Sequence, residues 1–530
     1  MAIKKYIADK DNTITNAYGT DLSTRASGSN MGAADILEVF SIYGQQTTSS
    51  VELSRTLVQF PVSNISADRT SGEIPDSGSV RFFLRLFNAR HSEQLPQSFT
   101  VNVLAVSASW QEGSGLDMES YTDKTKDTVE GSNWMNRLKA TQWDLPGGDY
   151  HSSSYTAGTS MPNYTFTFND GGENLLVDVT MAVEEWMASE QPNYGFGVFL
   201  TSSFEGSSSY NAPSDTGPLL HNPGGQTISY YTKRFFSRSS EFFFKKPCIE
   251  ARWDSRISDD RNNFYYSSSL APAANNLNTI YLYNYVRGEL VNIPKVGTGK
   301  ILVSIHSGSS DDTAPADGKL KLSIGETNGG LGGVITDGDL NVTGGYVSTG
   351  IYSASFAFTG SGDLKTIYDV WHAGATTLTT GARIEYATGS IRPKNLESPN
   401  WNQYNQYVTK ITNLKPKYTK SEQARFRVYT RPRNFSPTIY TVANTEIDNT
   451  VIPSSSYEII RMVDEYTVIN NSTGSTTNHT YLSYDKSGSY FDLDMSLLEP
   501  GYMYGVKLAY YSSGQWREQE EVFKFRVENN

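Results

Sequence analysis

Apolar and charged side chains alternate along Val80-Arg81-Phe82-Phe83-Leu84-Arg85-Leu86-Phe87, and this alternation indicates the fold class. Phe82, Leu84 and Leu86 share one face of an extended chain, and the two arginines share the other, as in a β-strand that buries one side. The turn-forming residues 75–78, Pro-Asp-Ser-Gly, precede this stretch. The pattern predicts a strand of a sheet that covers a core.

The composition extends this prediction to the whole chain. There are 34 Tyr and 24 Phe among 530 residues, and Ser, Thr, Asn and Gly make up much of the remainder. Aromatic residues suit half-buried sheet surfaces, while the strong helix formers give few runs of helical period. We therefore predict an all-β protein, whose length allows roughly three or four domains.

One segment departs from the strand pattern. Residues 100–106 and 195–200 have the near-continuous apolar character of buried strands, but in residues 179–188 the apolar side chains recur at helical spacing. This segment predicts a single helix, with Thr180 as its N-cap and Trp186 on the face that packs against the sandwich.

Charged residues crowd residues 250–261, where we place the end of the first domain. Asp254, Asp259 and Asp260 alternate there with arginines, which favours a solvated, charge-balanced linker over an acid and base pair. Paired carboxylates that meet only in the fold keep a glycan-cleaving enzyme open as a third alternative.

Short strand patterns continue after this boundary, with a Gly-rich excursion at residues 325–345 and a further alternating series between residues 424 and 527. The predicted architecture is an N-terminal jelly-roll-like β-sandwich followed by two smaller immunoglobulin-like β-sandwiches. The predicted domains are residues 1–255, 256–412 (with the Gly-rich loop) and 413–530.

Charge and cysteine content bear on partners and location. The 56 acidic and 44 basic residues give a formal net charge of −12 without any long basic run, so we expect no binding to nucleic acid. Cys248 is the single cysteine, which leaves no internal disulfide. We find no signal-peptide pattern and no apolar run long enough to span a membrane, and so expect assembly in the cytoplasm and no membrane insertion.

The first half resembles a DNRLRE-type module, a jelly-roll β-sandwich of bacterial surface proteins related in shape to carbohydrate-binding modules. The resemblance spans roughly residues 7 to 255 and implies fold more than activity. The matching residues are Ala8-Asp9, Asn12-Thr13-Ile14, Asn30-Met31-Gly32, Ser54-Arg55-Thr56-Leu57-Val58-Gln59-Phe60, Trp110-Gln111-Glu112-Gly113, Trp134, Val177-Asp178-Val179-Thr180, Trp186, Asn193-Tyr194-Gly195-Phe196-Gly197 and Phe236-Ser237-Arg238.

The whole chain also resembles uncharacterised virion proteins of marine contractile-tailed phages. The matching residues are Met1 to Asp11, Leu37-Glu38-Val39-Phe40-Ser41-Ile42-Tyr43-Gly44, Phe491-Asp492-Leu493-Asp494-Met495 and Glu499-Pro500-Gly501. This resemblance implies a component of the virion without specifying which part of the particle.

We find no motif for catalysis, metal binding or a cofactor. The six His are scattered without a metal-binding spacing, and Cys248 lies on a predicted buried strand without a partner base. Trp134, set among polar residues, and Trp143, just before the turn formers Pro146-Gly147-Gly148, are the candidates for a glycan-binding site, although core packing is the more frequent role of such side chains.

We therefore predict a non-enzymatic structural protein of a bacteriophage virion. It is expected to dock on tail, neck or baseplate proteins through its sandwich surfaces, in multiple symmetric copies. The alternative is a protein of the tail or capsid that recognises a host-surface glycan through the N-terminal module.

Overall fold

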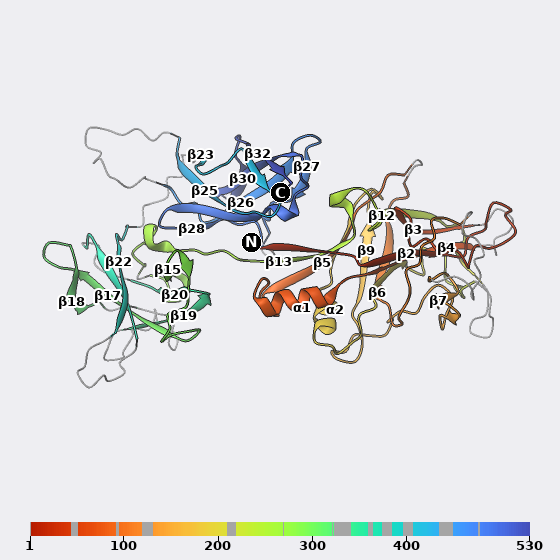
Figure 1. Ribbon diagram of the computed structural model, residues 1–530, viewed down its shortest axis with the longest axis horizontal. Coiled ribbons are helices and arrows are strands. Elements are labelled where there is room, and N and C mark those ends of the chain that lie inside the picture. Colours follow the sequence, from red (N-terminus) through yellow and green to blue (C-terminus); the bar gives the residue numbers. More distant parts are fainter. Residues whose placement is uncertain are drawn as a thin grey trace. The chain divides into compact units, whose positions relative to one another are not determined.

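Strands dominate the protein (Figure 1), which confirms the all-β prediction. The computed structural model describes residues 2–43, 51–91, 95–118, 131–208, 219–268, 270–320, 322, 341–358, 364–373, 384–395, 406–433, 449–474, 478–512 and 514–529. The described part of the chain divides into two compact units. Residues 2–254 and 474–479 form the N-terminal unit, and residues 255–473 and 480–530 form the C-terminal unit. The predicted division into three domains stays a prediction.

The N-terminal unit is a sandwich of two antiparallel sheets. In its described residues one sheet has the order β1 (Ile3–Ile7), β13 (Cys248–Trp253), β5 (Val80–Leu86), β10 (Leu175–Asp178). The other has the order β12 (Tyr230–Phe236), β3 (Ile36–Tyr43), β4 (Val51–Gln59), β11 (Phe196–Leu200), β6 (Phe99–Ala105), β9 (Asn163–Phe168), with β2 (Lys10–Thr15) also paired to β4. A short hairpin is formed by β7 (Asn136–Leu138) and β8 (Thr141–Gln142).

The alternation in β5 builds the core of this sandwich. Phe82, Leu84 and Leu86 are buried, and they share one apolar cluster with Val101 and Val103 of the opposite sheet. The predicted buried strands at residues 100–106 and 195–200 appear as β6 and β11. Apolar area removed from water by the two facing sheets holds the unit together.

Two helices, α1 (Val62–Ser71) and α2 (Thr180–Met187), lie side by side in this unit (Figure 1). The predicted helix is α2, and Trp186 packs into the core with its ring centroid 4.8 Å from that of Phe196. The prediction that Thr180 is the N-cap is wrong. Thr180 is already in the first turn of the helix, and its N–H donates to Asp178. The sequence pattern did not indicate α1, which buries only Val62 and Ile65 among its residues.

The C-terminal unit begins with strands from residues 278–391 that share one core. In the described residues these strands have the order β14 (Asn278–Tyr283), β20 (Ile351–Phe356), β19 (Val342–Ser348), β17 (Ile301–Gly308), β21 (Ile367–His372), β22 (Glu385–Ile391), with β18 (Pro315–Lys319) paired to β17 and a separate hairpin of β15 (Tyr285–Val286) and β16 (Glu289–Leu290). Ile280, Val303 and Trp371 belong to the core. Residues 325–340 of the predicted Gly-rich excursion lie outside the described residues.

The remaining strands of this unit form two sheets that face each other. In the described residues one has the order β23 (Tyr407–Ile411), β25 (Gln423–Pro432), β29 (Gly488–Asp494), β28 (Ser483–Asp485). The other has the order β24 (Lys417–Thr419), β32 (Phe523–Glu528), β30 (Met503–Ser512), β26 (Ser455–Arg461), β27 (Tyr466–Ile469), with β31 (Gln515–Glu518) also paired to β30. Aromatic rings fill the space between these sheets, and the Tyr457 and Phe491 centroids are 4.2 Å apart.

Candidate functional site

The two tryptophans predicted as glycan-binding candidates are interior side chains. Trp134 is 0% and Trp143 is 4% exposed, and both belong to an apolar cluster with Leu57. The Trp143 Nε1–H donates to the carbonyl of Asn133 at 2.9 Å. A ring that is enclosed in this way has no face on which a sugar can stack, so the described structure supports the packing role for both residues.

The charged stretch at residues 250–261 contains a buried charge, contrary to the prediction of a solvated linker. Glu250 lies on β13 and is 0% exposed. Its carboxylate is 2.8 Å from Arg85 and 3.4 Å from Lys5, and it also forms an ion pair with Arg252. Burial alone would raise the pKa of Glu250, but these three cations hold that pKa well below its usual range.

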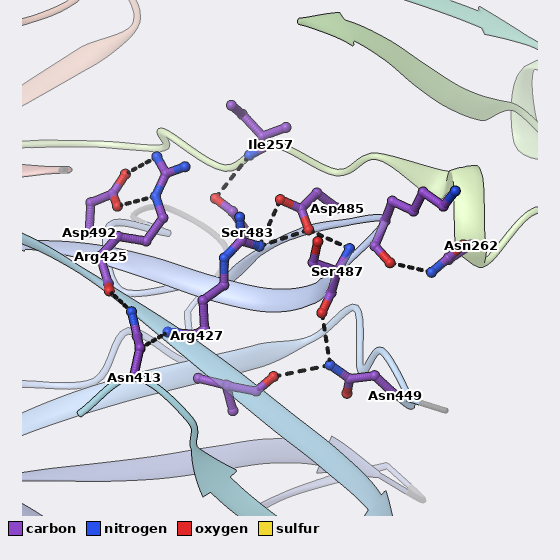
Figure 2. A network of polar contacts seen from close by, with 12 residues as sticks. Ile257, Asn262, Asn413, Arg425, Arg427, Asn449, Ser483, Asp485, Ser487 and Asp492 are labelled. Atoms are coloured by element: carbon purple, nitrogen blue, oxygen red, sulfur yellow. Dashed lines mark hydrogen bonds and ion pairs between the residues drawn. The ribbon is translucent and has the colours of Figure 1, made fainter. Parts of the chain in front are cut away.

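Residues 257–262, which we call the connecting segment, pair with β28 in the C-terminal unit. The Ile257 N–H donates to Ser483 Oγ at 3.1 Å, and the Tyr484 N–H donates to the Ile257 carbonyl at 2.9 Å. The Asp259 N–H in turn donates to the Tyr484 carbonyl at 3.0 Å. Figure 2 shows the hydrogen bond from Ile257 to Ser483. It also shows, further along the segment, the hydrogen bond that the Asn262 side chain donates to the carbonyl of Lys486. The segment thus forms a parallel β-bridge, between Ser258 and Tyr484, with the edge strand of this sheet.

The connecting segment also forms hydrogen bonds with β14 and an ion pair with β21. Asp260 accepts from the Thr279 N–H at 2.7 Å. The Arg261 guanidinium donates twice to Asp369, at 2.5 and 2.8 Å, and Asp369 accepts in addition from Trp371 Nε1 at 2.7 Å. The connecting segment therefore joins β28 to the sheet of residues 278–391.

Asp259 is a buried acid at the centre of this arrangement. It is 2% exposed, and burial raises its pKa to about 7, although the charge of Arg261 and the N–H groups of Arg261 and Tyr281 oppose the rise. The hydroxyl of Tyr283 is buried without a hydrogen-bond partner in the described residues. Since Asp259 is out of reach of solvent, the raised pKa does not make it a general acid for a substrate.

Two parallel ion pairs lie on the neighbouring strands, as Figure 2 shows. Arg425 binds Asp492 through two hydrogen bonds of 2.7 and 2.9 Å, and Arg427 binds Asp485 through two of 2.8 and 2.7 Å. Both guanidinium groups lie over the Tyr490 ring, at 4.4 and 4.7 Å. This geometry fixes each charge against a partner, which is the arrangement of a structural network.

Asn413 ties the backbone to the same network. Its side-chain nitrogen donates to the Arg425 carbonyl at 2.6 Å, and its side-chain oxygen accepts from the Arg427 N–H at 2.8 Å (Figure 2). Sequence reasoning missed this network and the pairing of the connecting segment, because the partners are far apart in the chain: 226 positions separate Ile257 from Ser483.

The single cysteine of the chain lies in the interior. Cys248 is 1% exposed, and burial raises the pKa of its thiol to about 12. No group of three or more His, Cys, Asp or Glu among the described residues is placed to hold a metal ion. The helices that the structure describes are each too short or too polar to span a membrane.

Comparisons with known proteins add little to this geometry. No protein-family model matches the chain, and no curated protein matches it. Three solved structures are similar to a small degree. The immunoglobulin domains 1 and 2 of DIP-gamma are 12% identical over 48% of this chain and 90% of that chain, with a TM-score of 0.12, and a marsupial T cell receptor is 7% identical over 52% of this chain and 70% of that chain, with a TM-score of 0.15. A Ca²⁺-stabilized ice-binding adhesin of an Antarctic bacterium is 9% identical over 98% of this chain and 100% of that chain, with a TM-score of 0.14. TM-scores of this size carry no argument about function.

Proposed function

We propose that the chain is a non-enzymatic structural protein of a tailed-phage virion that docks on tail, neck or baseplate proteins through its β-sandwich surfaces. The resemblance to virion proteins of marine contractile-tailed phages motivates the location. One observation supports the proposal that the chain is not an enzyme. The carboxylates of Glu250, Asp369 and Asp485 each form an ion pair with an arginine that holds the fold together.

Exposed side chains on an edge strand support docking as the mode of action. β12 ends the order of its sheet in the described residues, and Tyr230 at its start is 60% exposed, close in sequence to Ile228 at 68%. Exposed aromatic and aliphatic side chains beside a strand edge are features of surfaces that bind other proteins. Repeated copies on a symmetric particle turn modest contacts of this kind into stable attachment.

The alternative, recognition of a host-surface glycan through Trp134 and Trp143, loses its motivating feature because both rings are enclosed. An enzyme of the paired-carboxylate type is likewise unsupported, because both acidic residues that suggested it are held in place. Asp259 accepts hydrogen bonds from the backbone, and Asp260 accepts from the backbone of Thr279 and from the hydroxyl of Tyr484.

The test is to locate the chain in purified particles by cryo-electron microscopy, after mass spectrometry has established its presence. The expected result is density for both units against tail, neck or baseplate proteins, in a copy number set by the particle symmetry. Particles from a phage that lacks the gene serve as the control and should lose only this density. Absence of the chain from purified particles would refute the proposal.

A further inference from the structure

Three aromatic side chains form a row on the surface of the C-terminal unit. The ring centroids of Tyr511 and Trp516 are 5.6 Å apart, and those of Trp516 and Tyr481 are 5.5 Å apart. Tyr511 is 46% exposed, and the other two are half-buried. At one end of the row the Arg256 guanidinium lies 4.8 Å over the Tyr481 ring. We call Tyr481, Tyr511 and Trp516 the aromatic row.

Strand register places the aromatic row on the outer face of its sheet. Tyr510 is buried, and its hydroxyl bonds to Thr409 and Thr430 of the opposite sheet, so Tyr511 points outward. Trp516 is directly opposite Tyr511 in the β30 and β31 pair and therefore shares its face.

Tyr481 reaches the same face from the other side of β26. It is bridged to Ser456, which is itself opposite Ala509, two residues before Tyr511. Ser456 and Ala509 are 0% and 4% exposed although they lie on the outward face. Thr480, whose hydroxyl is hydrogen-bonded to that of Ser456 at 2.8 Å, contributes to this cover beside Tyr481.

The surroundings of the aromatic row are polar. Gln515, next to Trp516, is exposed, and Arg256 closes the opposite end. In the described residues of β30 and β31, the large apolar side chains that are exposed are Tyr511 and Met503, and Met503 is at the far end of β30. Trp, Tyr and Arg also anchor many protein interfaces, so a protein or peptide partner is the outcome that the test has to separate from a glycan.

We propose that the aromatic row is a binding site for an oligosaccharide chain. The C–H face of a pyranose ring packs on an aromatic face, and the sugar hydroxyls are left at its edge for a donor and acceptor such as the exposed Gln515. The rings of the row are tilted by 55° and 58° to their neighbours. A twisted platform suits a single soluble glycan chain better than the flat surface of a crystalline polysaccharide. The inference does not depend on the proposed virion location.

The test measures glycan binding by the full chain. The wild-type protein is screened on an array of bacterial surface polysaccharides and plant glycans, and a soluble polysaccharide that it retains is then used in native affinity gels. Trp516→Ala should weaken binding about tenfold or more, as loss of a central aromatic anchor does. Tyr511→Phe, which keeps the ring, should bind like the wild type. Tyr285→Ala removes another exposed tyrosine, from the β15 and β16 hairpin of the same unit, and should have no effect.

Two outcomes would overturn the proposal. One is a wild-type chain that retains no glycan on the array; the other is a Trp516→Ala variant that binds as tightly as the wild type. Circular dichroism of each variant shows that the fold is kept, so that a loss of binding by a folded Trp516→Ala variant supports the site. If the wild-type chain binds no glycan but is retained on an array of proline-rich peptides, the aromatic row is a peptide site and the proposal is refuted.

Discussion

At the scale of single residues, Glu250 shows how strongly an interior charge depends on its partners. Replacing Glu250 with Gln keeps the shape of the side chain but leaves Lys5, Arg85 and Arg252 facing a neutral group in the interior. We expect the free energy of unfolding of the N-terminal unit to fall by about 3 kcal/mol. Urea denaturation at neutral pH measures the change.

The matched control for this variant is Glu241→Gln, since Glu241 is exposed and its substitution should change stability by less than about 0.5 kcal/mol. Because the folded-state pKa of Glu250 lies below that of the unfolded chain, its stabilisation is complete above the ordinary pKa of a glutamate and is lost as the pH falls. Equal stabilities of Glu250→Gln and the wild type would show that the three cations do not need the carboxylate.

Asp259 is predicted to make the C-terminal unit less stable as the pH rises. Its pKa of about 7 in the folded state exceeds the value of about 4 in an unfolded chain, so the folded state holds a proton that the unfolded state has released. The free energy of unfolding should therefore decrease between about pH 4 and pH 7, with a slope of at most about 1.4 kcal/mol per pH unit. Asp259→Asn should flatten this slope.

Hydrogen exchange followed by mass spectrometry reports the two units separately in this experiment. Asp11 is a useful control, because burial raises the pKa of this N-terminal acid to about 7 as well. Asp11→Asn should alter the pH dependence of the N-terminal unit and leave that of the C-terminal unit unchanged. A slope in the C-terminal unit that Asp259→Asn does not alter would contradict the assignment.

At the scale of elements, strands with a clear alternation were predictable and α1 was not. In β5 the buried positions follow the period of the pleat, so a local pattern was sufficient to identify it. α1 carries only two buried residues, and its helical form depends on the surface that it covers. The N-cap of α2 was misplaced for a related reason, since Asp178 supplies the oxygen that binds the Thr180 N–H.

The pairing of the connecting segment with β28 can be tested at this scale. Ser483→Ala removes the oxygen that accepts from the Ile257 N–H. The loss of one hydrogen bond is worth about 1 kcal/mol, which corresponds to roughly fivefold faster hydrogen exchange at the Ile257 amide. Ser487→Ala is the control, because Ser487 is exposed and its hydrogen bonds to Asp485 and Asn449 use backbone atoms. The pairing is refuted if both variants exchange at the same rate.

At the scale of the whole molecule, the two compact units each have their own apolar core. We expect calorimetry to resolve at least two unfolding transitions, because the cores of the two units unfold as separate cooperative units. Phe82→Ala should destabilise the N-terminal unit by about 3 to 5 kcal/mol and lower only one transition temperature. The reciprocal variant Trp371→Ala, in the core of the C-terminal unit, should lower the other. A single transition that both variants shift equally would contradict this prediction.

The all-β class, the strand at residues 80–87, the helix at residues 179–188 and the apolar character of Cys248 could be predicted from the sequence, because each depends on the period or chemistry of neighbouring residues. Which charged and aromatic residues are enclosed depends on the tertiary fold. Glu250 and Asp259 look like solvated linker residues in the sequence, and Trp134 and Trp143 look like loop residues, yet all four are buried. Burial depends on side chains that come from distant strands, as Lys5 and Arg85 do for Glu250, and one local stretch of sequence does not contain that information.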